Sequence, residues 1–240
     1  MIISLLILVN FGLTQLGYLY YRNNNYSSPL TYGFNTTCLI FYILMSGLSI
    51  NSYLNGEMSL LSLNTDTRIY KTSELFNLIT NLYVSHNLFA TFISLYLKNW
   101  IIIGHHLGCI LNLYYLSNYQ YCHYYHIFYY GLTNISNIYL SFMDIFKKDI
   151  ILISKFPNLY SIIRTLFAIL FIFLRIIMWS YYSFYFIYDS SIIYYKEESN
   201  NDLKNFLLIN KLVILIFTTL QFFWAKQIVN GVVKSLKKNK

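Results

Sequence analysis

Apolar runs long enough to cross a lipid bilayer recur along the whole chain. A transmembrane helix needs roughly 20 mainly apolar residues. Charged residues make up only 11% of this chain, whereas soluble domains usually carry about 25%. The sequence therefore predicts an all-α integral membrane protein with about seven transmembrane helices, near residues 1–21, 34–54, 75–97, 100–116, 124–146, 159–188 and 206–229.

The distribution of lysine and arginine predicts the orientation of these helices. Cytosolic loops of membrane proteins are enriched in both residues. Lys147, Lys148 and Lys155 follow the fifth segment and further lysines follow the seventh, whereas the connection between the fourth and fifth segments has neither residue. We therefore expect the C-terminus in the cytosol. We attribute the net charge of +8 to lysines and arginines that set the orientation of the helices, so no nucleic-acid partner is expected.

Three neighbouring segments each carry a stripe of polar residues. Positions three and four apart share one face of a helix. An unsatisfied polar group in hydrocarbon costs several kcal/mol, so such stripes must face other helices or a water-containing cavity. Either hydrogen bonds between helices or a functional site would explain the stripes. The stripes are Thr80, Asn87, Thr91 and Ser94 in the third segment, His105, Cys109 and Asn112 in the fourth, and Asn134, Asn137, Ser141 and Asp144 in the fifth.

Histidine and arginine inside apolar segments are the strongest candidates for chemistry. The adjacent imidazoles of His105 and His106 can titrate near neutral pH, and either could act as a general base. Arg175 lies in the middle of the sixth segment, where an arginine costs about 2.5 to 3.5 kcal/mol to insert. We expect Arg175 to hold a lipid phosphate or carboxylate, or to pair with Asp144 or the asparagine stripe.

The remaining histidines and the cysteines predict no metal site. His123 and His126 lie among tyrosines, which is typical of an aromatic belt at the membrane interface. Cys38, Cys109 and Cys122 lie in or beside apolar segments, where cysteine usually serves as a small buried apolar side chain. No pair of cysteines or histidines has metal-ligand spacing, so neither a metal nor a resident cofactor is expected.

Several short stretches follow one another along the chain: Arg68-Ile69-Tyr70, Asn81 to Asn87, His105-His106, Asn134 to Leu140 and Phe173 to Ile177. Their order resembles the TLC-domain family of endoplasmic-reticulum membrane proteins. The resemblance covers about residues 63–229, and it implies a helix bundle that encloses a lipid-sized cavity within the membrane. It divides the chain into N-terminal transmembrane helices (1–62), a TLC-like domain (63–230) and a basic cytosolic tail (231–240).

The same resemblance implies a role with lipids. Ceramide synthases of this family join an acyl group from acyl-CoA to a sphingoid amine, using the histidine pair and two downstream aspartates. Here Asn134 and Asn137 match those aspartates, and Asn87 matches an earlier one. An amide does not accept a proton near neutral pH. The sequence is therefore closer to the non-synthase branch, whose members are linked to membrane lipid composition, lipid sensing or cargo handling.

The predicted function is to bind, sense or modify membrane lipids in the endoplasmic reticulum. The resemblance implies that His105 and His106 are the reactive or head-group contacts and that Arg175 anchors an anionic group. Further contacts that bind or orient the lipid are expected from Asn87, Cys109, Asn134, Asn137 and Ser141.

Two alternatives to this function stay open. One is an active N-acyltransferase of the ceramide synthase type, with acyl-CoA as co-substrate. The other is a seven-helix receptor or transporter, which fits the number of segments. The sequence shows no proline within the transmembrane segments and no internal repeat of the transporter kind.

The sequence ends Lys237-Lys238-Asn239-Lys240, which resembles the dilysine signal that retrieval coats bind to return membrane proteins to the endoplasmic reticulum. We expect that changing Lys237 and Lys238 together to serine releases the protein to later compartments, as observed by microscopy. A reporter fused beyond Lys240 should have the same effect. An unchanged location would show instead that these lysines are only a basic stop after the last helix.

Overall fold

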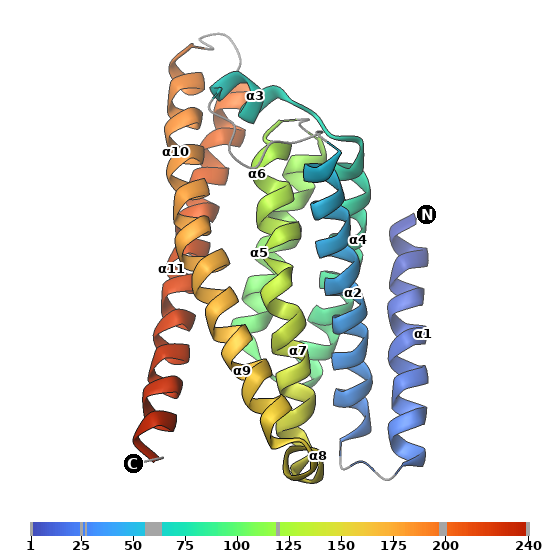
Figure 1. The fold of residues 1–240 in the computed structure, drawn as a ribbon. Helices are drawn as coiled ribbons and strands as arrows, with labels where there is room; N and C mark the ends of the chain where they lie inside the picture. The colour runs from blue at the N-terminus through green and yellow to red at the C-terminus, as the bar shows by residue number, and fades with distance from the viewer. Residues whose placement is uncertain are drawn as a thin grey trace. The chain divides into compact units, whose positions relative to one another are not determined.

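The computed structural model describes residues 2–24, 26, 28–55, 64–118, 121–196 and 201–238, without the side chains of 115–118 and 235–238. Within these ranges all regular structure is helical, which confirms the predicted all-α fold (Figure 1). The α-helices and π-helical segments (η) are α1 (Ile2–Asn23), α2 (Pro29–Leu54), α3 (Thr65–Tyr70), α4 (Glu74–Tyr96), α5 (Trp100–Asn118), α6 (His123–Ile127), η1 (Phe128–Leu132), α7 (Asn134–Lys148), α8 (Ile150–Lys155), α9 (Pro157–Phe171), η2 (Ile172–Met178), α10 (Trp179–Lys196) and α11 (Asn201–Lys238).

The predicted apolar segments correspond in order to helices of the structure. Four described helical stretches are long and apolar enough to cross a membrane: Ile2–Asn23, Pro29–Leu54, Pro157–Lys196 and Asn201–Lys234. The apolar part of α5, Trp100–Tyr114, is shorter. The chain is therefore a multi-pass membrane protein. The helix α11 continues past the expected end of the seventh segment to Lys238, while Asn239 and Lys240 lie outside the described residues.

The chain divides into two compact units, Met1–Ile163 and Arg164–Lys240. In the first unit α1 packs against α2 and α4, α2 packs against α7, and α5 packs mainly against α4. The two N-terminal helices thus contact the helices that follow residue 63 directly. In the second unit α10 and η2 pack against α11.

Two glycines allow α1 and α2 to make backbone contact. A Cβ atom on Gly17 would lie 2.7 Å from the Cα atom of Gly33, and one on Gly33 would lie 2.5 Å from the carbonyl oxygen of Thr14. On the same face the hydroxyls of Thr14 and Thr37 form a hydrogen bond of 2.8 Å. Small residues that bring backbones together are typical of helix pairs in membranes, where packing replaces the hydrophobic effect.

The start of α6 is fixed beneath α3, which corrects the interpretation of two histidines. The backbone N–H of Cys122 donates to the carbonyl of Ile69 (2.7 Å), and that of Ser73 donates to Nδ1 of His123 (3.0 Å). His123 and His126 are 2% and 0% exposed. The prediction of an interfacial belt is therefore wrong for both, because their rings stack on Phe76 and Tyr130 inside the protein.

Replacing Gly33 with alanine should lower the thermal midpoint of the purified protein. The new methyl group would collide with α1, and overpacking of this kind costs about 1 to 3 kcal/mol. Gly47→Ala is the matched control, because it lies on the same helix with no neighbour within 4 Å of its Cβ position. Equal midpoints for the two variants would contradict the close contact.

The stability of the first unit should fall as the pH drops below about 6.5. Burial lowers the pKa of His123, which precedes the fifth apolar segment, from its ordinary 6.5 to about 4, and the neutral ring accepts the bond from Ser73. The contribution of a base with a lowered pKa is complete above its unfolded pKa and is lost as the pH falls through the folded value. Thermal midpoints between pH 7 and pH 4 measure this loss.

The control for the pH dependence is His123→Asn. The asparagine oxygen can accept the bond from Ser73 but does not titrate. We therefore expect a smaller fall of the midpoint with pH in this variant. The same fall in both proteins would assign the pH dependence to other groups.

Candidate functional site

The histidine pair lies near the start of α5, directly after a tight turn from α4. Lys98 adopts a positive φ of 55° in this turn, and the N–H of Asn99 donates to the carbonyl of Ser94 (3.0 Å). The side chain of Asn99 then accepts a bond from the N–H of Ile102 (3.4 Å) at the beginning of α5. The turn therefore makes α4 and α5 an antiparallel pair and holds the histidines against α4.

His105 and His106 are both half-buried, but their surroundings differ. Their ring centroids are 5.9 Å apart. Nε2 of His105 lies 3.8 Å from the sulfur of Cys109, one turn later. Nδ1 of His106 is buried and has no hydrogen-bond partner among the described residues. His106 can thus take a further hydrogen bond from a ligand or a water molecule.

Asn112 extends the polar stripe of α5, as the spacing predicts. Its side chain is 2% exposed, and neither its oxygen nor its nitrogen has a hydrogen-bond partner within the described part of the chain. Cys109 on the same stripe is also buried. Because a buried polar group without a partner costs free energy, the amide of Asn112 is a second place where a bound molecule could be recognised.

On α4 the structure adds His86 to the candidate residues. Its ring stacks on Phe41 with 3.8 Å between centroids, and its Nδ1 donates to the side-chain oxygen of Asn10 (3.1 Å). His86 also lies within electrostatic reach of His106. In the sequence, the only signal for His86 is its position beside the polar stripe of the third segment, because local patterns do not reveal that α1 and α2 cover this part of α4.

Asn87 is buried beside His86, but its amide is used locally. Its side-chain nitrogen donates to the backbone carbonyl of Tyr83 (2.7 Å). The backbone carbonyl of Asn87 accepts a bond from the hydroxyl of Thr91 (2.7 Å). Tyr83 also packs edge-on against Tyr130, with centroids 4.8 Å apart. Tyr130 in turn stacks on His126. The aromatic contact between α4 and η1 was missed in the sequence, where single tyrosines are too frequent to stand out.

The asparagines of α7 bond within α7 and to the preceding segment η1. The nitrogen of Asn134 donates to the carbonyl of Tyr130 (2.6 Å), and its oxygen accepts a bond from Asn137 (2.9 Å). Ser141 is buried further along the same helix, whereas Asp144 is partly exposed and pairs with Lys147. Because α7 packs mainly against α2 and α5 packs mainly against α4, the orientation of the histidines by these asparagines stays a prediction.

Arg175 belongs to the second unit and has a neutral partner there. It lies in η2, and its Nη1 donates to Oε1 of Gln221 on α11 (3.3 Å). The guanidinium also lies 5.6 Å from the centroid of the Phe171 ring. Both side chains of the Arg175–Gln221 pair are buried. The second unit therefore supplies a hydrogen-bond acceptor for the guanidinium from within. The role of Arg175 as an anchor for an anionic group stays a prediction.

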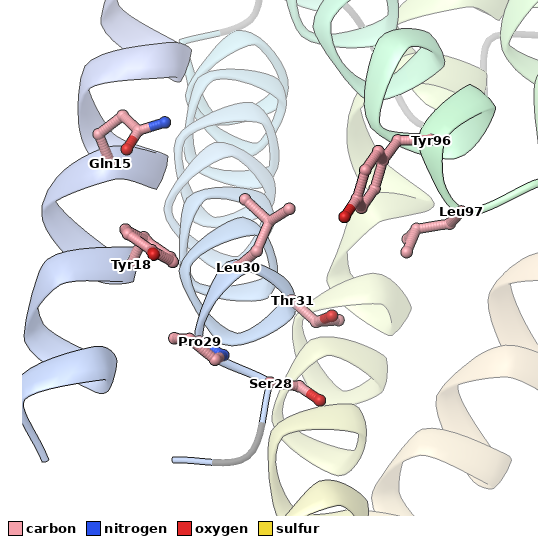
Figure 2. A pocket seen from close by; sticks show the side chains of 8 residues that line it. All are labelled: Gln15, Tyr18, Ser28, Pro29, Leu30, Thr31, Tyr96 and Leu97. Carbon is pink, nitrogen blue, oxygen red and sulfur yellow. The ribbon is translucent and has the colours of Figure 1, made fainter. Parts of the chain in front are cut away.

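A groove in the first unit lies away from the histidines. It has a volume of about 510 Å³, and Figure 2 shows residues from α1 and the start of α2 facing the end of α4 across it. None of the predicted site residues lines this groove. Its lining is Gln15, Tyr18, Ser28, Pro29, Leu30, Thr31, Tyr96 and Leu97.

Comparison with known proteins adds the family. No curated protein and no solved structure matches this chain. The family model of the TLC domain matches residues 30–230, a range that contains the histidine pair, the asparagines of α7 and Arg175. The match covers most of the chain and agrees with the resemblance seen in the short motifs and with the helical membrane fold. The chain therefore belongs to the TLC-domain family.

Proposed function

We propose that this TLC-domain protein binds or senses a membrane lipid through α5 and thereby contributes to membrane lipid composition. The observation that carries the proposal is a set of buried polar atoms on one apolar helix, Nδ1 of His106 and the side-chain amide of Asn112, without hydrogen-bond partners among the described residues. These atoms need a hydrogen-bond donor or acceptor that does not come from the described residues. The hydroxyl, amide or phosphate groups of a lipid supply both.

The outer face of α5 suits the acyl chains of such a lipid. Trp100, Leu107 and Leu111 are exposed on this helix, and their spacing of seven and then four residues places them along one side. The polar stripe lies toward α4, with which α5 pairs. A lipid that reaches the edge of this pair could therefore keep its chains against the apolar side while its polar part bonds to His106 or Asn112.

The asparagines of α7 support binding over acyl transfer. Asn134 occupies the position that resembles a catalytic aspartate, yet its amide bonds to Tyr130 and Asn137 and has no group that takes up a proton near neutral pH. A histidine that acts as a general base gains from a carboxylate that stabilises its charged form. No carboxylate stands at position 134 or 137, so the chemistry of the synthases lacks its acidic partners.

The location in the endoplasmic reticulum with a cytosolic C-terminus is part of the same proposal. The family relationship supports the location, and the lysines after α7 support the orientation.

Native mass spectrometry of the purified protein tests the proposal. We expect one lipid class to be retained, and His106→Leu or Asn112→Leu to weaken its retention by about five-fold, which corresponds to about 1 kcal/mol for one hydrogen bond. Thr91→Val is the matched control, because the hydroxyl of Thr91 is already bonded within α4. Unchanged retention in both α5 variants would contradict the proposal.

The same preparations distinguish binding from catalysis. The wild-type protein, supplied with long-chain acyl-CoA and sphingoid or lysolipid acceptors, should retain its lipid but form no acylated product. A product that disappears in His105→Ala and His106→Ala would instead show an acyltransferase.

A further inference from the structure

The axis of the short helix α8 runs in a different direction from that of α7, which precedes it. It follows α7 after Asp149, whose side chain accepts a bond from the N–H of Leu152 (3.0 Å) and so begins the helix. In Figure 1, α8 is seen almost end-on, whereas α7 runs along the length of the first unit. The helix therefore lies crosswise to α7. A helix that lies across the direction of the spanning helices lies along the membrane surface.

Protein packing does not account for the apolar side chains of α8. None of its residues is buried. Ile150 and Ile151 are 80% and 77% exposed, and Phe156, directly after the helix, is also exposed. Large apolar side chains at a membrane surface are stabilised when they enter the boundary between head groups and acyl chains.

Lysines surround these apolar residues. Lys147 pairs with Asp144 over 3.6 Å, and the carboxylate of Asp149 caps α8. Lys148 and Lys155 have no salt bridge among the described residues, and the ammonium group of Lys155 lies 5.4 Å from the centroid of the Phe156 ring. Two cations next to exposed isoleucines are complementary to a membrane surface in which negatively charged head groups cover apolar acyl chains.

Aromatic residues at the same end mark the level of the membrane interface. The pKa of Tyr26, between α1 and α2, is raised by burial and by the nearby carboxylate of Asp149, so this connection lies close to the start of α8. Tyr21, Tyr26 and Tyr32 pack together there, with centroids about 5 Å apart. Tyrosines are enriched where helices leave the bilayer.

We infer that α8, together with Lys148 and Lys155, is a binding surface for anionic phospholipid head groups. Ile150 and Ile151 enter the interface, and the two ammonium groups bond to head-group phosphates or carboxylates. In the predicted orientation this surface meets the cytosolic leaflet, which carries the anionic lipids. The surface is separate from the histidines of α5 and does not depend on the proposed function.

Hydrogen exchange of the full-length protein in nanodiscs tests this inference. Backbone amides of residues 150–156 should exchange at least about five-fold more slowly in discs that contain phosphatidylserine than in discs of phosphatidylcholine alone, since one lysine near an anionic surface contributes about that factor. The difference should disappear in Lys148→Gln/Lys155→Gln and shrink at high salt.

Two further variants complete the experiment. Ile150→Ser/Ile151→Ser should speed exchange in both kinds of disc, because it removes the apolar anchor. Lys71→Gln/Lys196→Gln loses the same charge from the connections before the third and before the seventh segment. With seven segments and a cytosolic C-terminus these connections are lumenal, so this variant should keep the wild-type difference. Equal exchange of the wild-type protein in the two kinds of disc would overturn the inference in favour of a cytosolic protein partner. If the control variant also lost the difference between the discs, a general charge effect would replace the inference.

Discussion

The hydrogen-bonding needs of polar groups in an apolar surrounding control this structure. In hydrocarbon no water is present to satisfy them, so each group must find a partner within the protein or from a bound molecule. Most described polar side chains in the spanning helices meet this need locally. Thr37, Asn87 and Asn134 donate to the carbonyl four residues earlier. His106 and Asn112 are among the described residues with buried side-chain atoms that do not, as are Ser46, Thr80 and Ser190; His106 and Asn112 lie on the same helix.

The same constraint explains why much of the fold could be predicted. Long apolar runs can only be helices in a membrane, and the predicted segments match the helices from α1 to α11 in order. The stripe of His105, Cys109 and Asn112 also follows from helical spacing alone. The pairing of helices could not be predicted in this way. The contact of Gly17 with Gly33 needs the fold, since a glycine has no side chain whose pattern can be read.

The candidate site was predicted less completely than the fold. Spacing placed His105 on a polar stripe of the fourth segment. The structure adds His86 of α4, whose ring stacks on Phe41 of α2. His123 and His126 were misread, because a tyrosine-rich segment at a helix end looks the same whether it faces lipid or lies beneath α3. The bond from Ser73 to His123 joins residues 50 positions apart, and local patterns carry no information on such pairs.

The π-helical segment η1 has a consequence for any comparison between this chain and its family. A π-turn contains one more residue than an α-helical turn. The side chains after it therefore point in a direction that is rotated about the helix axis relative to the side chains before it. His126 and Asn134 lie on opposite sides of Phe128–Leu132. An alignment with a relative whose helix is α-helical throughout must therefore open a one-residue gap inside this segment. Only then are the buried face before η1 and the asparagine face after it both matched to their counterparts.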